Sequence, residues 1–356
     1  MKGRVLIALL VASCLAMPVA AQQPAPGNAP RPAAGPARPG LPPPEPIEHI
    51  TGNVYKIFGG GGNTLVVVQS DGVLLVDTKM PGNGQAILDE VRKVTDKPIT
   101  TIISTHSHPD HTGSTDFIRE KYPNVRIIMS EGTKAELAAN PRGNPALLPT
   151  ETYKDRLTIG EGADRVELYH TGVGHTGGDT FVLIPSARLL FMGDVMAWNM
   201  APFLPAGGAM AIADETEKLV EAVKGKVDIV VEGHGHVNDW AGLVRLAKFN
   251  RALVTAARAA YDRGDPPGVA VAELKKNPDF APLLDTHIKK GLEYGNTPLA
   301  RANMNVNIAY AEFAGEQVGF GIANGGPLPE TDKHKGSDPK DTAPPTPEML
   351  AAAVAK

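Results

Sequence analysis

The stretch STHSHPDHTG, residues 104–113, contains three histidines and an aspartate within six consecutive positions. The residues directly before it, 99–104, predict a short apolar strand, so the cluster begins where a strand ends. His106 and His108 are two positions apart, and side chains at that spacing point the same way along an extended chain. Neutral imidazoles bind zinc well, and an oxygen ligand such as Asp110 leaves room for water. Six residues can hardly complete two metal sites alone, so we expect further ligands elsewhere.

Three more candidate ligands follow predicted apolar strands further along the chain: His175, Asp194 and His234. Each is directly preceded by glycine, which lets the backbone turn sharply and approach its neighbours closely. Four strand ends therefore present metal-binding residues. We expect these strand ends to lie at one edge of the sheets.

The chain around these motifs alternates between predicted strands and helices. Strands are expected over 53–58, 64–70, 73–77, 99–104, 125–130, 166–170, 180–185, 188–192 and 227–231, and helices over 84–95 and 115–122. The residues DETE, 214–217, resemble a capping box and predict a helix from there to 224. Short buried strands separated by helices indicate a layered α/β arrangement.

From Asp239 onward the predicted structure is helical only. Residues 243–264 predict a long amphipathic helix with Gly264 at its C-cap, and further helices are expected near 281–294 and over 298–313. This helical extension could cover the site or mediate a homodimer. The sequence does not choose between these two roles.

The first residues have the layout of a secretory signal peptide. Lys2 and Arg4 precede a short apolar run, which ends in small residues and predicts cleavage after Ala21. A membrane span needs about 20 apolar residues, more than this run offers. We therefore expect a periplasmic or secreted protein without a membrane anchor after cleavage. Residues 11–14, VASC, leave an alternative open, because they resemble a lipoprotein box that would place a lipid on Cys14.

Composition excludes several classes of function. Cys14 is the only cysteine, so the mature chain would have no disulfide and no thiolate ligand or nucleophile. Cleavage removes the positive charges of Lys2 and Arg4 and moves the formal net charge from −4 to −6. Such a chain lacks the basic surface of a nucleic-acid binder and the polybasic patch of a membrane-surface binder. The expected partner is a small-molecule substrate.

We expect five segments along the chain: a signal peptide (1–21), a Pro/Ala-rich disordered linker (22–46), the domain that carries the candidate ligands (47–240), the helical extension (241–320) and a disordered tail (321–356). The linker and the tail are rich in proline and small residues, and such segments cannot build a core.

The order and spacing of the ligand motifs resemble those of the metallo-β-lactamase fold superfamily. The motif His106-x-His108-x-Asp110-His111 is followed by His175, Asp194 and His234, and the segment VDT, 76–78, matches the family's strand-end aspartate. A lone His-x-His motif is weak evidence for this superfamily, whereas five spaced motifs in the right order are a specific signal. The resemblance covers residues 54–240 and implies an αββα sandwich, here followed by the helical extension.

The resemblance also implies a site for two zinc ions. One Zn2+ would be held by His106, His108 and His175, and the other by Asp110, His111 and His234, with Asp194 contacting both. Asp77 would orient a ligand imidazole without touching metal; an ordinary strand-end aspartate is the alternative. The family pattern favours the histidine of Gly-His-Gly as ligand, which leaves His236 at the rim of the site.

Two divalent ions about 3.5–4 Å apart can share a hydroxide, because they bring the pKa of water down to about 7. The resemblance therefore implies hydrolysis of an ester, lactone, thioester, amide or phosphoester bond, with Asp110 as the catalytic residue that steers the hydroxide. Metal binding without catalysis is disfavoured, since structural zinc sites tend to be closed by four protein ligands.

Two other activities stay open. A periplasmic β-lactamase fits the expected location, although zinc β-lactamases typically carry cysteine at the position of Asp194 and lysine where this chain has Ala197. A mono-iron persulfide dioxygenase shares the His-x-His-x-Asp-His motif, but the full second ligand set argues for two metals. Two segments could form walls of the site: the glycines 59–62, as a flap or a plain turn, and the apolar 196–210, which could instead pack under the helices.

Overall fold

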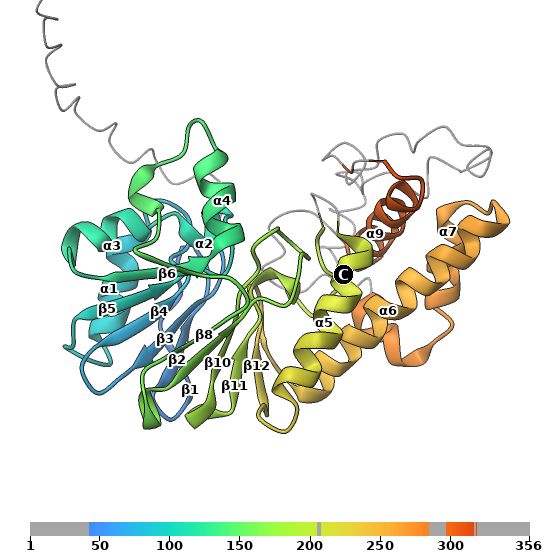
Figure 1. The fold of residues 1–356 in the computed structure, drawn as a ribbon. Helices are drawn as coiled ribbons and strands as arrows, with labels where there is room; N and C mark the ends of the chain where they lie inside the picture. The colour runs from blue at the N-terminus through green and yellow to red at the C-terminus, as the bar shows by residue number, and fades with distance from the viewer. Residues whose placement is uncertain (1–42, 205–207, 285–296, 317, 319–356) are drawn as a thin grey trace, which may run out of the picture. The chain divides into compact units, whose positions relative to one another are not determined.

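The computed structural model of the 356-residue chain describes residues 43–204, 208–284, 297–316 and 318 (Figure 1). All of these belong to one contact unit, Pro36–Lys356. The predicted signal peptide, the linker up to residue 42 and the predicted tail lie outside the described residues. Within the described ranges, no helix combines the length and the apolar character that crossing a membrane requires.

The first of two sheets has seven strands, which lie side by side in the order of the chain. They are β1 (Glu48–Thr51), β2 (Val54–Ile57), β3 (Thr64–Val68), β4 (Val73–Val76), β5 (Ile99–Ile103), β6 (Arg126–Ser130) and β7 (Glu151–Tyr153). Strands β1 to β4 pair antiparallel, and β4 to β7 pair parallel. Because β4 and β5 are parallel, their carboxyl ends bring Asp77 and the stretch 104–113 to the same edge.

The second sheet has six strands in the order β13-β12-β11-β10-β9-β8. They are β8 (Arg156–Ile159), β9 (Val166–Tyr169), β10 (Phe181–Ile184), β11 (Leu189–Phe191), β12 (Ile229–Val231) and β13 (Val237–Asp239). β11 and β12 form its one parallel pair, so Asp194 and His234 follow neighbouring carboxyl ends. The other pairs in this sheet are antiparallel.

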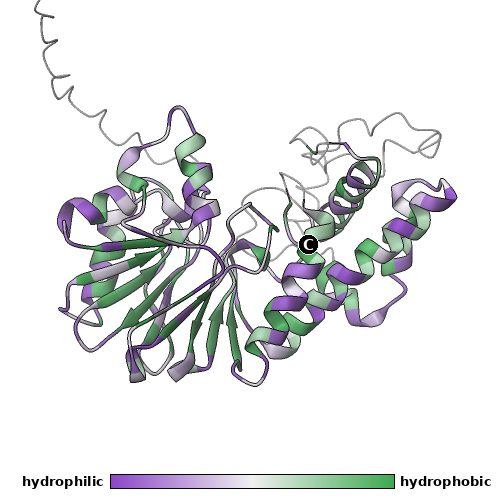
Figure 2. Cartoon of the chain, viewed as in Figure 1, coloured by the Kyte–Doolittle hydropathy of each residue, from purple (hydrophilic) through white to green (hydrophobic). Residues whose placement is uncertain are grey.

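Successive side chains of a strand point to opposite faces of its sheet, so the first sheet can pack against the second sheet on one face and against helices on the other. In β4, Leu74 and Val76 belong to the core between the two sheets, whereas Val73 and Leu75 face the helices outside. Those helices are α1 (Gly84–Arg92) and α3 (Thr115–Lys121), and their Ile87 and Ile118 complete the outer core. The predicted αββα sandwich is confirmed, and Figure 2 shows the apolar residues concentrated in the strands.

The outer face of the second sheet is covered by helices that include the C-terminal ones (Figure 1). They are α5 (Ala209–Val223), α6 (Trp240–Arg263), α7 (Pro267–Leu274), α8 (Ala281–Leu284) and α9 (Pro298–Phe313). Phe181 and Leu190 of the sheet share one hydrophobic cluster with Leu246 of α6 and Tyr310 of α9. The helices after residue 240 therefore complete the core of the sandwich. The remainder of the helix predicted over 281–294 lies outside the described residues.

The capping box predicted at residues 214–217 is wrong, because α5 begins at Ala209. Its N-cap, Gly208, offers no side chain, but the carboxylate of Glu312 in α9 accepts hydrogen bonds from the backbone amides of residues 208, 209 and 210 at 2.6, 3.1 and 2.9 Å. A carboxylate at a helix N-terminus satisfies unpaired amides and complements the helix dipole. Asp214 instead pairs with Arg251 on the outside of α6.

Candidate metal centre

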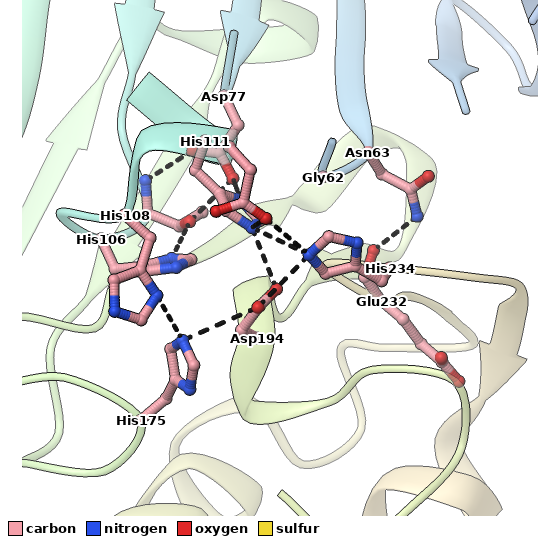
Figure 3. Close-up of polar contacts among 12 residues, drawn as sticks. Gly62, Asn63, Asp77, His106, His108, His111, His175, Asp194, Glu232 and His234 are labelled. Atoms are coloured by element: carbon pink, nitrogen blue, oxygen red, sulfur yellow. Dashed lines mark hydrogen bonds and ion pairs between the residues drawn. The ribbon is translucent and has the colours of Figure 1, made fainter. Parts of the chain in front are cut away.

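Seven side chains from four strand ends converge at one edge of the sandwich (Figure 3). They fall into two groups: His106, His108 and His175, and then Asp110, His111, Asp194 and His234. Within each group, one ligand-type atom from every residue lies within 4.8 Å of the others. The structure thus brings together all seven residues predicted as metal ligands and divides them as the sequence analysis expected, with Asp194 in the second group.

The first group consists of imidazoles only. The Nε2 atom of His175 lies 2.9 Å from Nδ1 of His108, and the rings of His106 and His175 meet edge-on with centroids 4.8 Å apart. His106 Nε2 is buried and has no hydrogen-bond partner within the described part of the chain. Three nitrogen lone pairs directed into one space are a donor set that suits zinc.

The second group mixes imidazoles and carboxylates. His234 Nε2 lies 3.1 Å from Asp110 Oδ2 and 3.2 Å from His111 Nε2. His111 Nε2 is in turn 3.1 Å from Asp194 Oδ1. A short helix, α2 (Pro109–Thr112), carries Asp110 and His111 directly after His108. Neighbouring residues of the chain therefore contribute ligands to both groups.

Asp194 contacts both groups. Its Oδ2 atom lies 3.4 Å from His234 Nε2 and 3.6 Å from His175 Nε2. It sits in a 3-10 turn, Gly193–Val195, directly after β11. A Cβ atom on Gly233 would lie 2.2 Å from Asp194 Oδ1, so the glycine before His234 lets the two strand ends approach each other.

Asp77 lies behind the ligands and is linked to both groups. Its Oδ2 accepts a hydrogen bond from His111 Nδ1 at 2.7 Å and another from the Thr105 hydroxyl at 2.7 Å. Thr105 Oγ1 lies 2.9 Å from His106 Nδ1. With the hydroxyl proton directed at Asp77, His106 donates to Thr105 through Nδ1 and keeps the Nε2 lone pair free. Asp77 has φ 63°, a left-handed conformation that side chains rarely adopt, which marks a constrained site.

Other contacts hold His175 and its loop. The carbonyl of Phe203 accepts from His175 Nδ1 at 2.5 Å and leaves Nε2 for the site. Glu136, in α4 (Glu131–Ala139), accepts hydrogen bonds from Ser107 and from the amide of Gly177 and so ties the loop before His108 to the loop after His175. The carboxylate of Asp179 accepts from the Thr176 amide, so it stabilises the turn next to His175.

The glycine loop 59–62 is buried beneath the ligands rather than lying over them. A Cβ atom on Gly62 would lie 2.3 Å from Cε1 of His111. The Gly62 amide donates to the Asp110 carbonyl at 3.0 Å, and the next amide, of Asn63, donates to the Gly233 carbonyl at 2.7 Å. This loop therefore fixes the ligand segments, which is the role of a turn and not of a flap.

The segment after Asp194 packs against the ligands and against α9. The ring of Trp198 stacks on that of His234, with centroids 4.5 Å apart. Asn305 of α9 donates to the Pro202 carbonyl at 2.9 Å, and the side chain of Leu204 is buried in the cluster shared with the helices. Met196, Ala201 and Leu204 therefore pack under the helices, whereas Trp198 lies against a ligand. His236 is exposed and belongs to neither group.

The two groups differ in the charge they hold. Burial, together with the neighbouring imidazoles, lowers the pKa of His106 far below its usual value. Burial also lowers the pKa of His175, to about 3. Burial opposes protonation of His234 as well, but the carboxylates of Asp194 and Asp110 outweigh it and raise its pKa to about 9. The pKa of His111 is raised for the same reason.

Both groups suit divalent cations. The first offers neutral imidazole lone pairs, one of them without a partner, and the second offers two carboxylates that attract positive charge onto His111 and His234. The side chains of Asp110 and Asp194 each remain 13% exposed, so the site is in contact with solvent. Thr105, Glu136 and the Phe203 carbonyl were not predicted, because a threonine, a surface-type glutamate and a backbone carbonyl carry no distinctive signal in one sequence.

A layered αββα sandwich with two His/Asp groups at one edge defines a class of metal-dependent hydrolases. The family model of the metallo-beta-lactamase superfamily matches residues 57–234, half of the chain, and the protein belongs to this superfamily.

Relatives cover parts of the chain. It is 31% identical over 162 residues to the 2,4-dinitroanisole O-demethylase subunit alpha of Nocardioides sp., a match that covers 44% of this chain and 48% of the subunit. It is 28% identical over 181 residues to the metallo-beta-lactamase type 2 of Bacillus cereus, covering 50% of this chain and 68% of that enzyme. The chain therefore spans about half the length of the demethylase subunit.

Among solved structures, the sec-alkylsulfatase Pisa1 from Pseudomonas sp. has a TM-score of 0.60 at 18% identity, over 80% of this chain and 52% of that one. The DIM-1 metallo-beta-lactamase has a TM-score of 0.51 at 20% identity, over 59% of this chain and 98% of the other. Both show the fold. The alkylsulfatase match also extends beyond the half of the chain that the family model covers.

Proposed function

We propose that the protein is an exported hydrolase that uses two zinc ions to cleave an ester, lactone, thioester or amide bond in a small molecule. The observation that carries this proposal is the pair of adjacent groups joined by Asp194. His106, His108 and His175 would hold one zinc ion, and Asp110, His111 and His234 the other. Two divalent cations, when bound, supply Lewis acidity and bring the pKa of water close to neutrality, to about 7.

The chain's own residues would position the reaction. Asp110 would steer the attacking water by accepting a hydrogen bond from it, because it is partly exposed at the site and neighbouring His111 and His234 hold its pKa below the usual value. A carboxylate in that state is ionised at neutral pH and can accept a hydrogen bond. Asp77 and the Phe203 carbonyl keep the ligand imidazoles in one tautomer by accepting from Nδ1.

The first test is metal analysis of protein purified without added metal, followed by a panel of a generic ester, a homoserine lactone, a thioester, nitrocefin and a phosphodiester. We expect about two zinc ions per chain and turnover of at least one carbonyl substrate. One iron per chain without hydrolysis would favour the dioxygenase alternative and contradict the proposal.

Asp110→Ala should abolish turnover while the circular-dichroism spectrum and melting curve stay those of a folded protein. The matched control is Asp116→Ala in α3, an aspartate outside both groups. If Asp110→Ala hydrolysed the panel as fast as the parent, the proposed role of this carboxylate would be wrong.

Hydrolysis of β-lactams is the second candidate. The 28% identity to the Bacillus cereus enzyme favours it. The position of Ala197, which lacks a cationic side chain, disfavours it. Nitrocefin in the panel decides between strong and negligible lactamase activity.

Export and assembly are part of the proposal. N-terminal sequencing of protein from the periplasm or medium should give Gln22 as the first residue, whereas a lipid-modified Cys14 would keep the protein in the membrane fraction. Light scattering would show whether the protein is a monomer or, as proposed for the helical extension, a homodimer.

A further inference from the structure

The last described helix places a cation beside the metal centre. Arg301 of α9 is only 3% exposed. Its guanidinium carbon lies 5.3 Å from the ring of Trp198 and 5.5 Å from the ring of Phe203. Cations at such distances from aromatic faces are held in place by the ring electrons.

Each of these aromatic residues contacts a different metal-binding group. The Trp198 ring stacks on His234 of the second group at an interplanar angle of 21°. The Phe203 ring lies 6.1 Å from the ring of His175 in the first group, and its carbonyl accepts from that histidine. Arg301 therefore packs against Trp198 and Phe203, and these two residues connect it to the ligands of both groups.

The hydrogen bonds of Arg301 are incomplete. Its Nη1 donates to the Ala201 carbonyl at 3.5 Å, a long contact. Its Nε is buried and has no hydrogen-bond partner among the residues that the structure describes. No carboxylate in the described ranges forms an ion pair with it, since the charges that act on it, Asp194 and Glu232, do so only at a distance. A buried cation of this kind is costly unless another group pairs with it.

Arg301 nevertheless stays charged. Burial lowers the pKa of its guanidinium to about 10, and Asp194 and Glu232 oppose that fall. It therefore carries a proton at neutral pH. Arg258 of α6 shows the contrast, because it also lies over an aromatic ring, that of Phe313, but its side chain is 46% exposed and it pairs with Asp262 at 3.6 Å.

We propose that Arg301 binds a carboxylate of the substrate, so that α9 forms part of the active site and selects anionic substrates. The Nε atom, which has no hydrogen-bond partner among the described residues, belongs to the planar Nε–Nη2 fork that binds a carboxylate through two parallel hydrogen bonds. The neighbouring Trp198 and Phe203 would exclude water from that pair. This inference rests on the proposed hydrolase function.

The test compares two esters with the same leaving group, neutral 4-nitrophenyl butyrate and the anionic mono-4-nitrophenyl ester of glutaric acid. Arg301→Gln should lower kcat/KM for the anionic ester by about 10- to 100-fold, because hydrogen bonds to charged groups contribute about 1.5–3 kcal/mol, and change the neutral ester less than about twofold. Arg301→Lys keeps the charge without the fork and should lie between. The matched control, Arg258→Gln, should affect neither ester.

A binding measurement separates this inference from the proposed function. Zinc-loaded protein is titrated with phenylacetate and with phenylacetamide, and tryptophan fluorescence is recorded. We expect Arg301→Gln, but not Arg258→Gln, to weaken phenylacetate binding about tenfold and to leave phenylacetamide unchanged.

The outcomes are distinct. An equal loss on both esters would mean that Arg301 only supports the Trp198–Phe203 segment, and would overturn the inference while hydrolysis stands. Arg301-dependent binding of phenylacetate without hydrolysis of any substrate in the panel would uphold carboxylate binding by Arg301 and refute the hydrolase. Binding of neither probe by the parent protein would overturn the inference.

Discussion

The two metal-binding groups lie side by side but have opposite electrostatics. His106, His108 and His175 form a group of imidazoles in which burial suppresses protonation. In the other group, the carboxylates of Asp110 and Asp194 raise the pKa values of His111 and His234, and these histidines in turn lower the pKa values of the two carboxyl groups. The first group can therefore accept a cation without releasing protons, whereas the second must give up protons as a cation binds. We expect the first position to be filled at lower pH than the second.

Removing the residue that joins the two groups should have a very large effect on turnover. Asp194→Ala takes away the carboxylate that lies within 3.6 Å of histidines in both groups. We expect kcat/KM on the best panel substrate to fall by at least about 10³-fold, as when one member of a cooperating catalytic unit is lost. Asp228→Ala, at an exposed ion pair with Arg188, is the control and should leave the rate unchanged. A loss smaller than tenfold would show that the groups do not work as a unit.

Adding a methyl group at Gly62 should disturb metal binding by the second group alone. In Gly62→Ala the new Cβ would meet the His111 ring at 2.3 Å, so the ring must leave its present position beside Asp110 and His234. We expect bound zinc to fall from about two ions per chain to about one, measured by elemental analysis. Gly225→Ala, where a Cβ has open space and only the left-handed φ is strained, should cost about 1 kcal/mol of stability and no metal. Loss of both ions in Gly62→Ala would show that the groups are not separable.

The opposite pKa shifts predict a maximum in the stability of metal-free protein near pH 6.5. The pKa of His234 is raised to about 9, so its stabilisation is complete below about pH 6.5 and is lost as the pH rises through 9. The pKa of His175 is lowered to about 3, so the unfolded chain binds more protons and stability falls as the pH drops from 6.5. Thermal melts of chelator-treated protein between pH 4 and 9 test this. In His234→Gln the fall on the alkaline side should become shallower, and a melting temperature that rises toward pH 9 would contradict the assignment.

The smallest effect should come from removing the hydroxyl group of Thr105, which lies between Asp77 and His106. Thr105→Val removes the contact between Asp77 and His106 but leaves the backbone hydrogen bond from the Thr105 amide to Asp77. We expect zinc affinity, measured by competition with a chelating dye, to fall about tenfold, the lower end for a residue that orients a ligand. Thr158→Val on the exposed face of β8 is the control. An unchanged affinity would mean that His106 needs no orienting partner.

The strands and the ligands were predictable because their signals are local. Strand β4 alternates between two cores, and its residues are apolar for that reason. The ligand histidines follow such strands directly, and glycine precedes each later ligand.

The features that could not be predicted from the sequence involve partners that are distant in the chain, backbone groups or short edge strands. The amides at the start of α5 are satisfied by Glu312, 104 positions from Gly208, so no neighbouring residue marks the true start of that helix. His175 is oriented by a carbonyl that any residue in place of Phe203 could supply. The edge strands β1 and β13 have three or four residues with at least partly exposed side chains, too short and too polar for alternation to be visible.

The position of α9 at the end of the described chain has a consequence for synthesis. All seven candidate ligands leave the ribosome before α9 does, yet α9 holds the segment whose Phe203 carbonyl orients His175. A nascent chain can therefore display its histidines while the first group is still loose. A premature stop before Pro298 would therefore yield a polypeptide in which every ligand is present but the position of His175 is not fixed.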